Sequence, residues 1–412
     1  MIKILQVRNI DSFVESRRQK TSEKDRKTVQ SILNDVRKNG DSAVKKYERK
    51  FNGRKTSHLR VSAKEIKEAR SKISREEVIA LQTMSARLSN SSPKIQIRGS
   101  RKFVAIPSVG CYIPGGQARY PSSVVMSVIP AKMAGVKRIV VVSPLGRDGK
   151  IDPLTIVAAK MCGATEIYKV GGAQAIGALA YGTKSIPKVD KIVGPGGKFV
   201  SIAKSLVSDQ TAIDMVAGPT ELGIIADASS DPELIALDLI SQAEHSRDTM
   251  CFVITQSKIM AKQIQKSIEK LIPGTERSSI IKESISKNGF IAVCRNENEM
   301  IGLANEIAPE HMELMVKNAK TLSKKITGAG LLLIGKNTPS SASDYLLGTN
   351  HILPTNGFGR TRGGLSILDF LKLQTVIESK KSGLRNISKS LKVLTDAEDL
   401  PNHYKAVKRR LD

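Results

Sequence analysis

An alternation of short apolar runs with longer amphipathic patterns is the feature that most constrains how this sequence folds. The runs are typical of buried strands and the intervening patterns of helices. The apolar runs span residues 138–143, 166–170, 191–193, 222–226, 251–255, 290–294 and 331–334, and the helical patterns span 152–162, 173–181, 199–208 and 232–245. Because parallel strands need a crossover, usually a helix, this rhythm predicts an α/β fold with two similar parallel-sheet domains.

Helices are predicted for the first ninety residues and for the C-terminal tail. Apolar positions at helical spacing, a helix stop at Asn39-Gly40 and two capping boxes support the first prediction. The apolar positions are Val29, Ile32, Leu33 and Val36, and the boxes pair Ser62 with Glu65 and Ser74 with Glu77. Residues 353–364, rich in Pro and Gly, predict a long loop, and a polar helical tail begins near Ile367.

An excess of basic residues, 66 Lys and Arg against 39 Asp and Glu, gives the 412-residue chain a formal charge of +27. Such a field attracts polyanions, so a nucleic-acid-binding or polyanion-binding protein is one candidate class. However, Trp is absent, aromatic residues make up 4% of the chain, and no basic run is interleaved with Phe or Tyr as a base-stacking platform requires. We therefore expect a solvated basic surface and no specific nucleic-acid partner.

The four cysteines, Cys111, Cys162, Cys251 and Cys294, form no CxxC pair and do not cluster. Reduced thiols are therefore expected, with no disulfide framework or thiolate zinc site. For Cys111 a buried, unreactive thiol is expected rather than a nucleophile. The N-terminus lacks the apolar region of a signal peptide, and Lys or Arg interrupts each long apolar stretch, so we expect a cytoplasmic protein without a membrane partner.

Histidine is scarce, and four of the five histidines lie in short polar clusters after residue 240. The clusters are Gln242-Ala-Glu-His245, Pro309-Glu-His311, Gly348-Thr-Asn-His351 and Glu398-Asp-Leu-Pro-Asn-His403. A single histidine beside a carboxylate is usually an ordinary surface or core residue. Four such clusters together indicate metal-assisted proton transfer. Asp344, between the second and third clusters, is the natural carboxylate ligand.

Gln242 and His245 are three residues apart on a predicted helix, so they share a face and could bind one metal ion. On general chemistry Glu244 or Asp248 would be the better oxygen donor, with Gln242 as a hydrogen-bonding residue.

Glu310 and His311 precede an apolar run at 312–316 that predicts a strand. Neighbouring residues at a strand entrance project in different directions, so the pair could serve separate proton transfers around one substrate. The alternative for Glu310 and His311 is a solvated loop pair.

Three glycine-rich turns lie at or near strand-to-helix transitions, at residues 112–116, 170–174 and 193–197. Glycine lets a backbone approach an anion, and a helix N-terminus favours phosphate. None of the turns is GxGxxG, and each alone is more typical of an ordinary turn. Together, at the carboxyl ends of strands in one sheet, they favour nucleotide binding.

Eight motifs occur in the order found in the histidinol dehydrogenase family, and the chain resembles that family from about residue 25 to His403. The motifs are Tyr112-Ile-Pro-Gly-Gly, Val170-Gly-Gly-Ala-Gln-Ala-Ile, Asp190-Lys-Ile-Val-Gly-Pro-Gly, Ala217-Gly-Pro-Thr-Glu, Ser241-Gln-Ala-Glu-His, Ala308-Pro-Glu-His, Gly348-Thr-Asn-His-Ile-Leu-Pro-Thr and Glu398-x-Leu-x-x-His403. The resemblance implies oxidation of L-histidinol to L-histidine in two NAD-dependent steps through an enzyme-held aldehyde, the last steps of histidine biosynthesis.

The resemblance also implies which residues form the site. Zinc would be held by Gln242, His245, Asp344 and His403, the last from the other subunit of a homodimer. NAD would contact Tyr112, Gln174 and Gly197. The substrate would contact Thr220, His311, His351 and Glu398 as well as the four zinc ligands. His311 would accept the hydroxyl proton, and Glu310 would activate the water that hydrates the aldehyde.

For the fold, the resemblance implies two Rossmann-like domains related by duplication, small helical terminal segments and an intertwined homodimer. The expected domains are an N-terminal helical segment at 1–22, a metal and substrate domain at 23–111 with 221–365, an NAD-binding domain at 112–220, and a helical tail at 366–412 that docks on the partner subunit.

Three residues depart from the family's usual pattern. Gly197 replaces a common asparagine, Thr220 replaces serine, and Ser340 stands where glutamate is frequent. Because Gly197 has no side chain to donate a hydrogen bond, weaker NAD binding is expected. The alternatives that remain are a related zinc and NAD dehydrogenase for another polar alcohol, and a polyanion-binding protein without catalysis.

Overall fold

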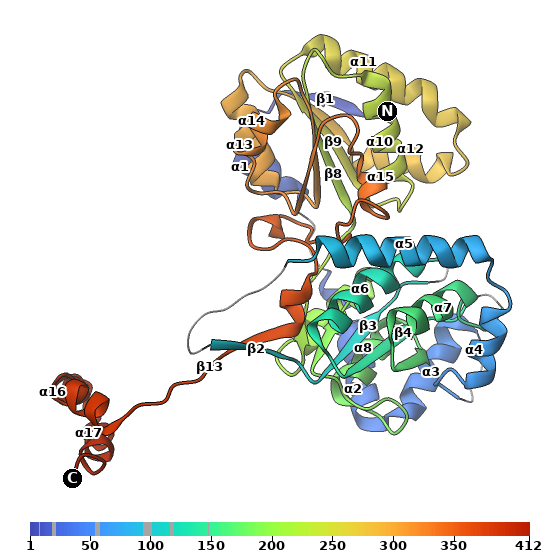
Figure 1. The fold of residues 1–412 in the computed structure, drawn as a ribbon. Coiled ribbons are helices and arrows are strands. Elements are labelled where there is room, and N and C mark those ends of the chain that lie inside the picture. The colour runs from blue at the N-terminus through green and yellow to red at the C-terminus, as the bar shows by residue number, and fades with distance from the viewer. Residues whose placement is uncertain (8, 19–21, 54–57, 94–100, 116–118, 147) are drawn as a thin grey trace. The chain divides into compact units, whose positions relative to one another are not determined.

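A six-stranded parallel sheet with strand order β1-β10-β9-β8-β11-β12 is one of two large sheets in the computed structural model (Figure 1). The strands are β1 (Lys3–Leu5), β8 (Glu221–Ala226), β9 (Met250–Thr255), β10 (Phe290–Val293), β11 (His311–Met315) and β12 (Leu331–Ile334). The structure describes residues 1–7, 9–18, 22–53, 58–93, 101–115, 119–146 and 148–412.

Helices cover both faces of this sheet (Figure 1). One face packs against α10 (Pro232–Ala243), α11 (Lys258–Leu271) and α12 (Ser278–Asn288), and the other against α1 (Ile10–Arg17), α13 (Glu297–Ile307) and α14 (Ala319–Ser323). The short α15 (Ser340–Ser343) contacts α10, and 3₁₀ turns lie at Ile272–Gly274, Phe358–Arg360 and Ile367–Phe370. Most strand residues are apolar on both sides because both faces are buried, and the exceptions include Glu221 on β8 and Glu313 on β11.

The second large sheet is also parallel, with strand order β5-β4-β3-β6-β7. Its strands are β3 (Ser108–Tyr112), β4 (Arg138–Ser143), β5 (Glu166–Lys169), β6 (Lys191–Val193) and β7 (Ala212–Ile213). One face packs against α4 (Ala63–Arg70), α5 (Arg75–Ser91), α6 (Pro121–Ala134) and α7 (Pro153–Cys162), and the other against α2 (Glu23–Asn39), α3 (Asp41–Asn52), α8 (Gly172–Tyr181) and α9 (Lys198–Val207).

Apart from the edge strand β1, the strand orders of the two sheets match. From β8 in one sheet and β3 in the other, the chain adds two strands on one side and then two on the other side. This is the order of a doubly wound fold, and its repetition supports the predicted duplication. The predicted boundaries of the central strands and helices are confirmed to within about three residues. Both predicted capping boxes are present, at Ser62 and Ser74.

The structure differs from the expected helical termini at two places. Residues Lys3–Leu5 form strand β1, which pairs with β10. At the other end, Leu371–Thr375 is strand β13, which pairs with β2 (Arg101–Ala105), so the helical tail begins later than Ile367. β1 has only three residues, and β13 alternates leucine with polar residues but is largely exposed, so neither gives the buried apolar run of a core strand.

The packing also differs from the expected grouping of 23–111 with 221–365. Helices α2–α5 pack on the five-stranded sheet, and β3 is that sheet's central strand. Grouped by packing, residues 23–91 therefore belong with 108–213. The metal, substrate and NAD labels of the domains remain predictions.

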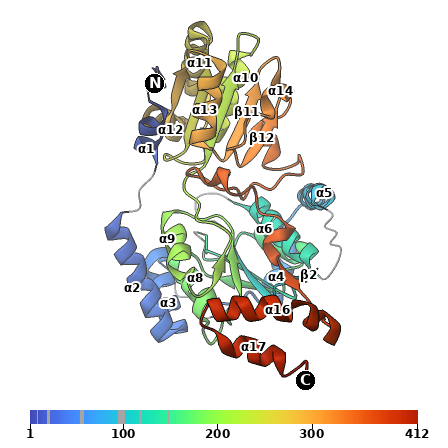
Figure 2. The same ribbon diagram turned by 90° about the vertical axis from the view of Figure 1, so that its left-hand side faces the viewer.

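Two compact units form the chain. Both large sheets belong to the first, which contains Met1–Pro93 and Ala105–Leu371. The second contains Lys372–Asp412 and the described part of Lys94–Val104. In it, α16 (Lys381–Ala397) and α17 (Pro401–Lys408) pack side by side (Figure 2).

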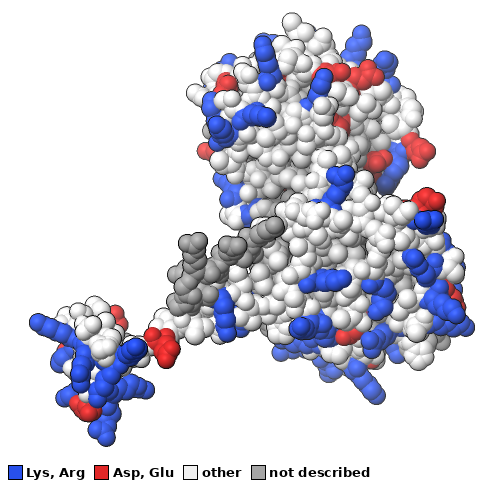
Figure 3. Space-filling model, in the orientation of Figure 1, with Lys and Arg blue, Asp and Glu red and all other residues white. Residues whose placement is uncertain are grey.

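Basic side chains are spread over the visible surface of both units, with acidic ones among them (Figure 3). This dispersion is typical of a solvated surface. Cys111, Cys162, Cys251 and Cys294 are all buried and free, as expected, and burial raises the pKa of the Cys111 thiol. Among the described residues, no helix is long and apolar enough to cross a membrane.

A buried ion pair fixes the turn after β6. Lys204 on α9 and Asp214 after β7 form this pair with almost no solvent exposure. Lys204 Nζ donates to the Gly194 carbonyl at 2.9 Å, and the Gly194 N–H donates to Asp214 Oδ2 at 2.7 Å. Gly194 has φ of 112°, and a Cβ there would collide with the Tyr112 carbonyl. The turn therefore depends on both charges and on glycine.

We expect Lys204→Met to lower the free energy of unfolding by about 3–5 kcal/mol, because Asp214 would stay buried without its counter-charge. Lys204→Met combined with Asp214→Asn should recover part of that loss. The control is Lys198→Met on the same helix, whose exposed pair with Asp25 is worth about 1 kcal/mol or less. Urea unfolding measures the stability of all three variants. Equal midpoints for Lys204→Met and Lys198→Met would contradict a stabilising role of the buried Lys204–Asp214 pair.

Candidate functional site

A cavity of about 570 Å³ brings strand ends from both large sheets together. The six-stranded sheet contributes the amino ends of β8 and β11, and the five-stranded sheet contributes the glycine turn after the carboxyl end of β6. The sequence-predicted site residues that line the cavity are Gly197, Thr220, His245, Glu310, His311, Asp344 and His351. Residues of three of the four histidine clusters, separated by up to about a hundred positions, thus line one cavity.

The carboxylate of Glu310 connects β11 to the start of β8. Its Oε2 accepts hydrogen bonds from Thr220 Oγ1 and, at 3.0 Å, from the Glu221 N–H. Gln242 Nε2 in turn donates to Thr220 Oγ1 at 2.8 Å. Burial raises the pKa of Glu310, although the His311 charge and these hydrogen bonds oppose it. Glu310 is only 6% exposed, so the alternative of a solvated loop pair is wrong.

His311 lies between backbone and carboxylate partners. Its Nδ1 is 3.3 Å from the Glu221 carbonyl oxygen, and its Nε2 is 3.3 Å from Asp344 Oδ1. Burial lowers the pKa of His311, but the negative charges of Glu310 and Asp344 outweigh it and raise the pKa to about 9. Burial raises the pKa of Asp344, but the hydrogen bond and charge of His311 lower it overall.

Asp344 is placed by α15, which it terminates. The first residue of that helix, Ser340, donates its N–H to Glu313 Oε1 on β11 at 2.6 Å. The Asp344 backbone carbonyl lies 2.8 Å from His351 Nδ1, and His351 Nε2 lies 3.2 Å from Ser123 Oγ. Burial lowers the pKa of His351. Asp344 and His351 are therefore held in place by backbone contacts, which leave the Asp344 carboxylate for His311 or a ligand.

The implied zinc ligands of the first unit fit that metal in kind. His245 Nδ1 lies 3.1 Å from the Gln242 carbonyl oxygen, which leaves Nε2 as the nitrogen available to a metal. With Asp344 and the Gln242 amide, the donors are one nitrogen and two oxygens, as zinc accepts. Across the described residues, no group of three or more His, Cys, Asp or Glu is arranged to hold a metal. The proposed set of His245, Asp344 and Gln242 contains only two residues of those types, so it is not a group of that kind.

Of the three residues expected to contact NAD, only Gly197 lines the cavity. Gly197 caps α9, and the space around its missing side chain is open. Tyr112 and Gln174 are buried and do not line the cavity. The Gly172 N–H donates to the Tyr112 hydroxyl at 3.0 Å, and Gln174 Nε2 donates to Glu48 Oε1 at 2.8 Å. Gly116, the last residue of the turn at 112–116, lies outside the described residues.

Basic side chains at the cavity were missed by sequence reasoning. Arg119 and Arg277 line it, and both also line an adjoining cavity of about 830 Å³ that includes Lys150. This second cavity is bounded by Ser143 and Pro144, at and after the carboxyl end of β4. No motif surrounds these residues, and among 66 Lys and Arg their sequence positions do not distinguish them from surface residues.

Glu398 and His403 belong to the second unit. Glu398 follows the last residue of α16, and His403 lies on α17. Both are exposed within that unit.

Comparison of this chain with a family model, with related proteins and with a solved structure identifies one family. A family model described as histidinol dehydrogenase matches residues 15–411. A histidinol dehydrogenase from Methanococcus maripaludis is 43% identical over 398 residues, 93% of each chain, and one from Bacillus cereus is 42% identical over 398 residues, 94% of this chain and 92% of that one. The crystal structure of a histidinol dehydrogenase from Elizabethkingia anophelis superposes with a TM-score of 0.92 at 34% identity, covering 100% of this chain and 98% of that one. The chain belongs to the histidinol dehydrogenase family and is an oxidoreductase.

Proposed function

We propose that this protein oxidises L-histidinol to L-histidine, with NAD as the hydride acceptor in two successive steps and zinc as its metal. The observation that carries the proposal is the meeting of Thr220, Glu310, His311 and Asp344 in one cavity with the glycine turn after β6. Two proton acceptors beside a metal-binding carboxylate suit an alcohol oxidation followed by an aldehyde oxidation.

Zinc would be held by Gln242, His245, Asp344 and His403 of the partner subunit. When bound, it would anchor the amino and imidazole nitrogens of the substrate and so fix the alcohol carbon for hydride transfer to NAD. Arg119 and Arg277 offer cationic groups at the cavity for the NAD pyrophosphate.

In the first oxidation His311 receives the hydroxyl proton as the hydride leaves. The contact of Nδ1 with the Glu221 carbonyl places a proton on Nδ1 and leaves Nε2 as the acceptor. Its pKa of about 9 reflects the charges of Glu310 and Asp344, so a cation bound to Asp344 would lower that pKa and favour the neutral imidazole.

In the second oxidation Glu310 takes a proton from water as the water oxygen adds to the aldehyde carbon. Burial raises the pKa of Glu310, which makes its carboxylate a better base. His311 must release the proton from the first oxidation to solvent before it can act again. The hydrate would then give its hydride to bound NAD and its hydroxyl proton to His311, which leaves the carboxylate product. Retention of the aldehyde between the steps prevents release of a reactive intermediate.

Glu221 acts as a positioning residue for this pair. Its carboxylate accepts the Asn356 N–H at 2.9 Å and the Glu310 N–H at 3.2 Å, which ties the loop at 356 to the residue before β11. Burial and the Glu310 charge raise the pKa of Glu221 to about 8, although two backbone hydrogen bonds oppose the rise.

A related dehydrogenase for another polar alcohol is the second candidate. It would keep zinc and the Glu310–His311 pair, and change the residues that face the imidazole of histidinol. The presence of both His351 and Glu398 favours histidinol. NADH production with L-histidinol, compared with other amino alcohols, distinguishes the two, and no turnover of L-histidinol would overturn our choice.

Glu310→Gln should retain oxidation of L-histidinol to the aldehyde and slow oxidation of the aldehyde by about 10²–10⁴-fold, whereas His311→Asn should slow both by a similar factor. NADH formation with each substrate measures this. Glu244→Gln is the control, because Glu244 lines the same cavity but is exposed. Equal losses in both steps for Glu310→Gln would contradict separate roles.

Hybrid dimers test the shared site. His245→Ala and His403→Ala should each be inactive and lose zinc. If His403 completes the neighbour's site, dimers formed from an equal mixture should regain about a quarter of wild-type activity, since half the dimers are hybrids with one intact site of two. Inactive hybrids that mass spectrometry confirms as heterodimers would show that each site uses its own subunit's His403.

The stability of Glu221→Gln should depend less on pH than that of the wild type. The pKa of Glu221 is about 8 when folded and 4.5 in its unperturbed state, so the folded protein favours the protonated acid. Its contribution is complete below pH 4.5 and is lost as pH rises to about 8. Urea unfolding across this window should show the wild type losing stability relative to Glu221→Gln. A constant difference between the two proteins would contradict the raised pKa.

A further inference from the structure

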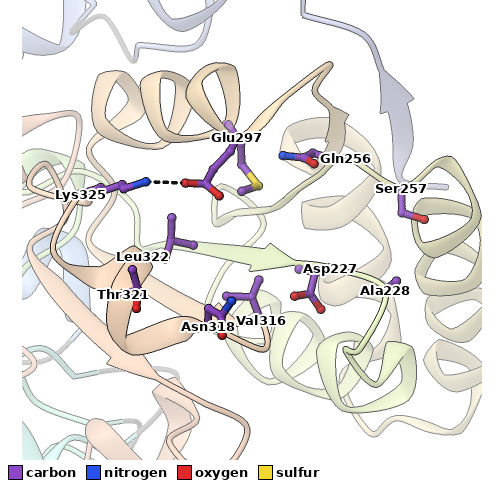
Figure 4. A pocket seen from close by; sticks show the side chains of 12 residues that line it. Asp227, Ala228, Gln256, Ser257, Glu297, Val316, Asn318, Thr321, Leu322 and Lys325 are labelled. Atoms are coloured by element: carbon purple, nitrogen blue, oxygen red, sulfur yellow. Dashed lines mark hydrogen bonds and ion pairs between the residues drawn. The ribbon is translucent and has the colours of Figure 1, made fainter.

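A cavity of about 550 Å³ lies at the carboxyl end of the six-stranded sheet. Figure 4 shows the side chains that line it, among them Asp227, Gln256 and Val316, which directly follow β8, β9 and β11. Thr220 and Glu310 precede β8 and β11, so the candidate active site uses the opposite end of the same strands. The proposed mechanism gives this 550 Å³ cavity no role.

The strand order makes this edge a place where ligands bind. From β8 the chain moves to β9 and β10 on one side, then crosses to β11 and β12 on the other side of β8. The connections leaving β8 and β11 therefore diverge and open a crevice between them. In open α/β sheets, ligands bind in such a crevice outside the carboxyl ends of the strands.

The lining of this cavity combines apolar side chains with two polar side chains that form no hydrogen bond within the described residues. Met300 and Leu322 are buried and Val316 is half-buried. The amides of Gln256 and Asn318 are exposed, and within the described chain neither side chain forms a hydrogen bond. An apolar surface with a few free amides suits a flat, uncharged heterocycle, whose faces pack on aliphatic side chains while its ring nitrogens pair with amides.

Phosphate does not fit this cavity. The first turns of the three long helices that begin at this edge are already capped, α10 by Asp231, α11 by Ser257 and α13 by Asn296. The connection from β8 to α10 contains no glycine. Asp227 and Glu297 add carboxylates to the wall, and Glu297 pairs with Lys325 at 2.7 Å (Figure 4). An anion would meet this negative charge and, at these three helices, capped first turns. The short α14 is the exception at this edge, because its cap Asn318 makes no side-chain hydrogen bond.

We propose that this cavity binds an uncharged nucleoside, with the base over Met300 and Leu322, its edge against Gln256 and Asn318, and the ribose hydroxyls toward the carboxylates. Because a phosphate is disfavoured, this site is distinct in chemistry from the one proposed for NAD. It also requires neither zinc nor histidinol, so its test is independent of the proposed function.

Methionine methyl NMR with adenosine as the probe tests this site in the full-length protein. Met300 lines this cavity and Met215 lines the candidate active site, so their methyl signals report the two places separately. Adenosine should shift the Met300 signal saturably, and AMP should bind there more weakly. Substitution of each methionine by leucine assigns its signal.

The double variant Gln256→Ala/Asn318→Ala should weaken adenosine binding at Met300 by about tenfold, as expected for two lost hydrogen bonds. Lys320→Ala is the matched control, because Lys320 is exposed on α14 and does not line the cavity. The proposal is overturned if adenosine leaves Met300 unshifted up to its solubility limit, or if the double variant binds adenosine as the wild type does. AMP binding as tightly as adenosine would overturn the exclusion of phosphate.

Discussion

The hydrogen bonds from Thr220 and the Glu221 N–H to Glu310 are the interaction on which the candidate site depends. They join the amino ends of β8 and β11, neighbouring strands of one sheet, and they set a buried carboxylate beside His311. A buried carboxylate without such partners would be costly, so the network that places Glu310 also makes its burial possible. Gln242 extends the network to α10 and thereby to the predicted metal ligands.

The two sheets contribute opposite strand ends to one cavity. The five-stranded sheet presents its carboxyl ends, where the glycine turn after β6 is fixed by Lys204 and Asp214. The six-stranded sheet presents its amino ends, where Glu310 and His311 lie. Two sheets with closely similar strand orders thus contribute different groups to the cavity, a glycine turn from one and titratable side chains from the other.

Patterns of period and spacing predicted most of the fold, because buried parallel strands and amphipathic helices leave strong local signals. The strands β1 and β13 were missed, because β1 has only three residues and β13 is largely exposed and was included in the predicted helical tail. The polar clusters predicted His245, Glu310, His311 and His351 as site residues, and all four line one cavity. Arg277 and the burial of Glu221 could not be predicted, because both depend on which segments meet in three dimensions.

We propose that a metal and the substrate meet in the cavity lined by His245, His311 and Asp344. Crystals grown with zinc and L-histidinol, with diffraction recorded on both sides of the zinc absorption edge, would locate both ligands. We expect an anomalous peak bonded to Gln242, His245 and Asp344, with the substrate hydroxyl facing His311. A zinc peak or substrate density elsewhere, with this cavity holding only solvent, would contradict it.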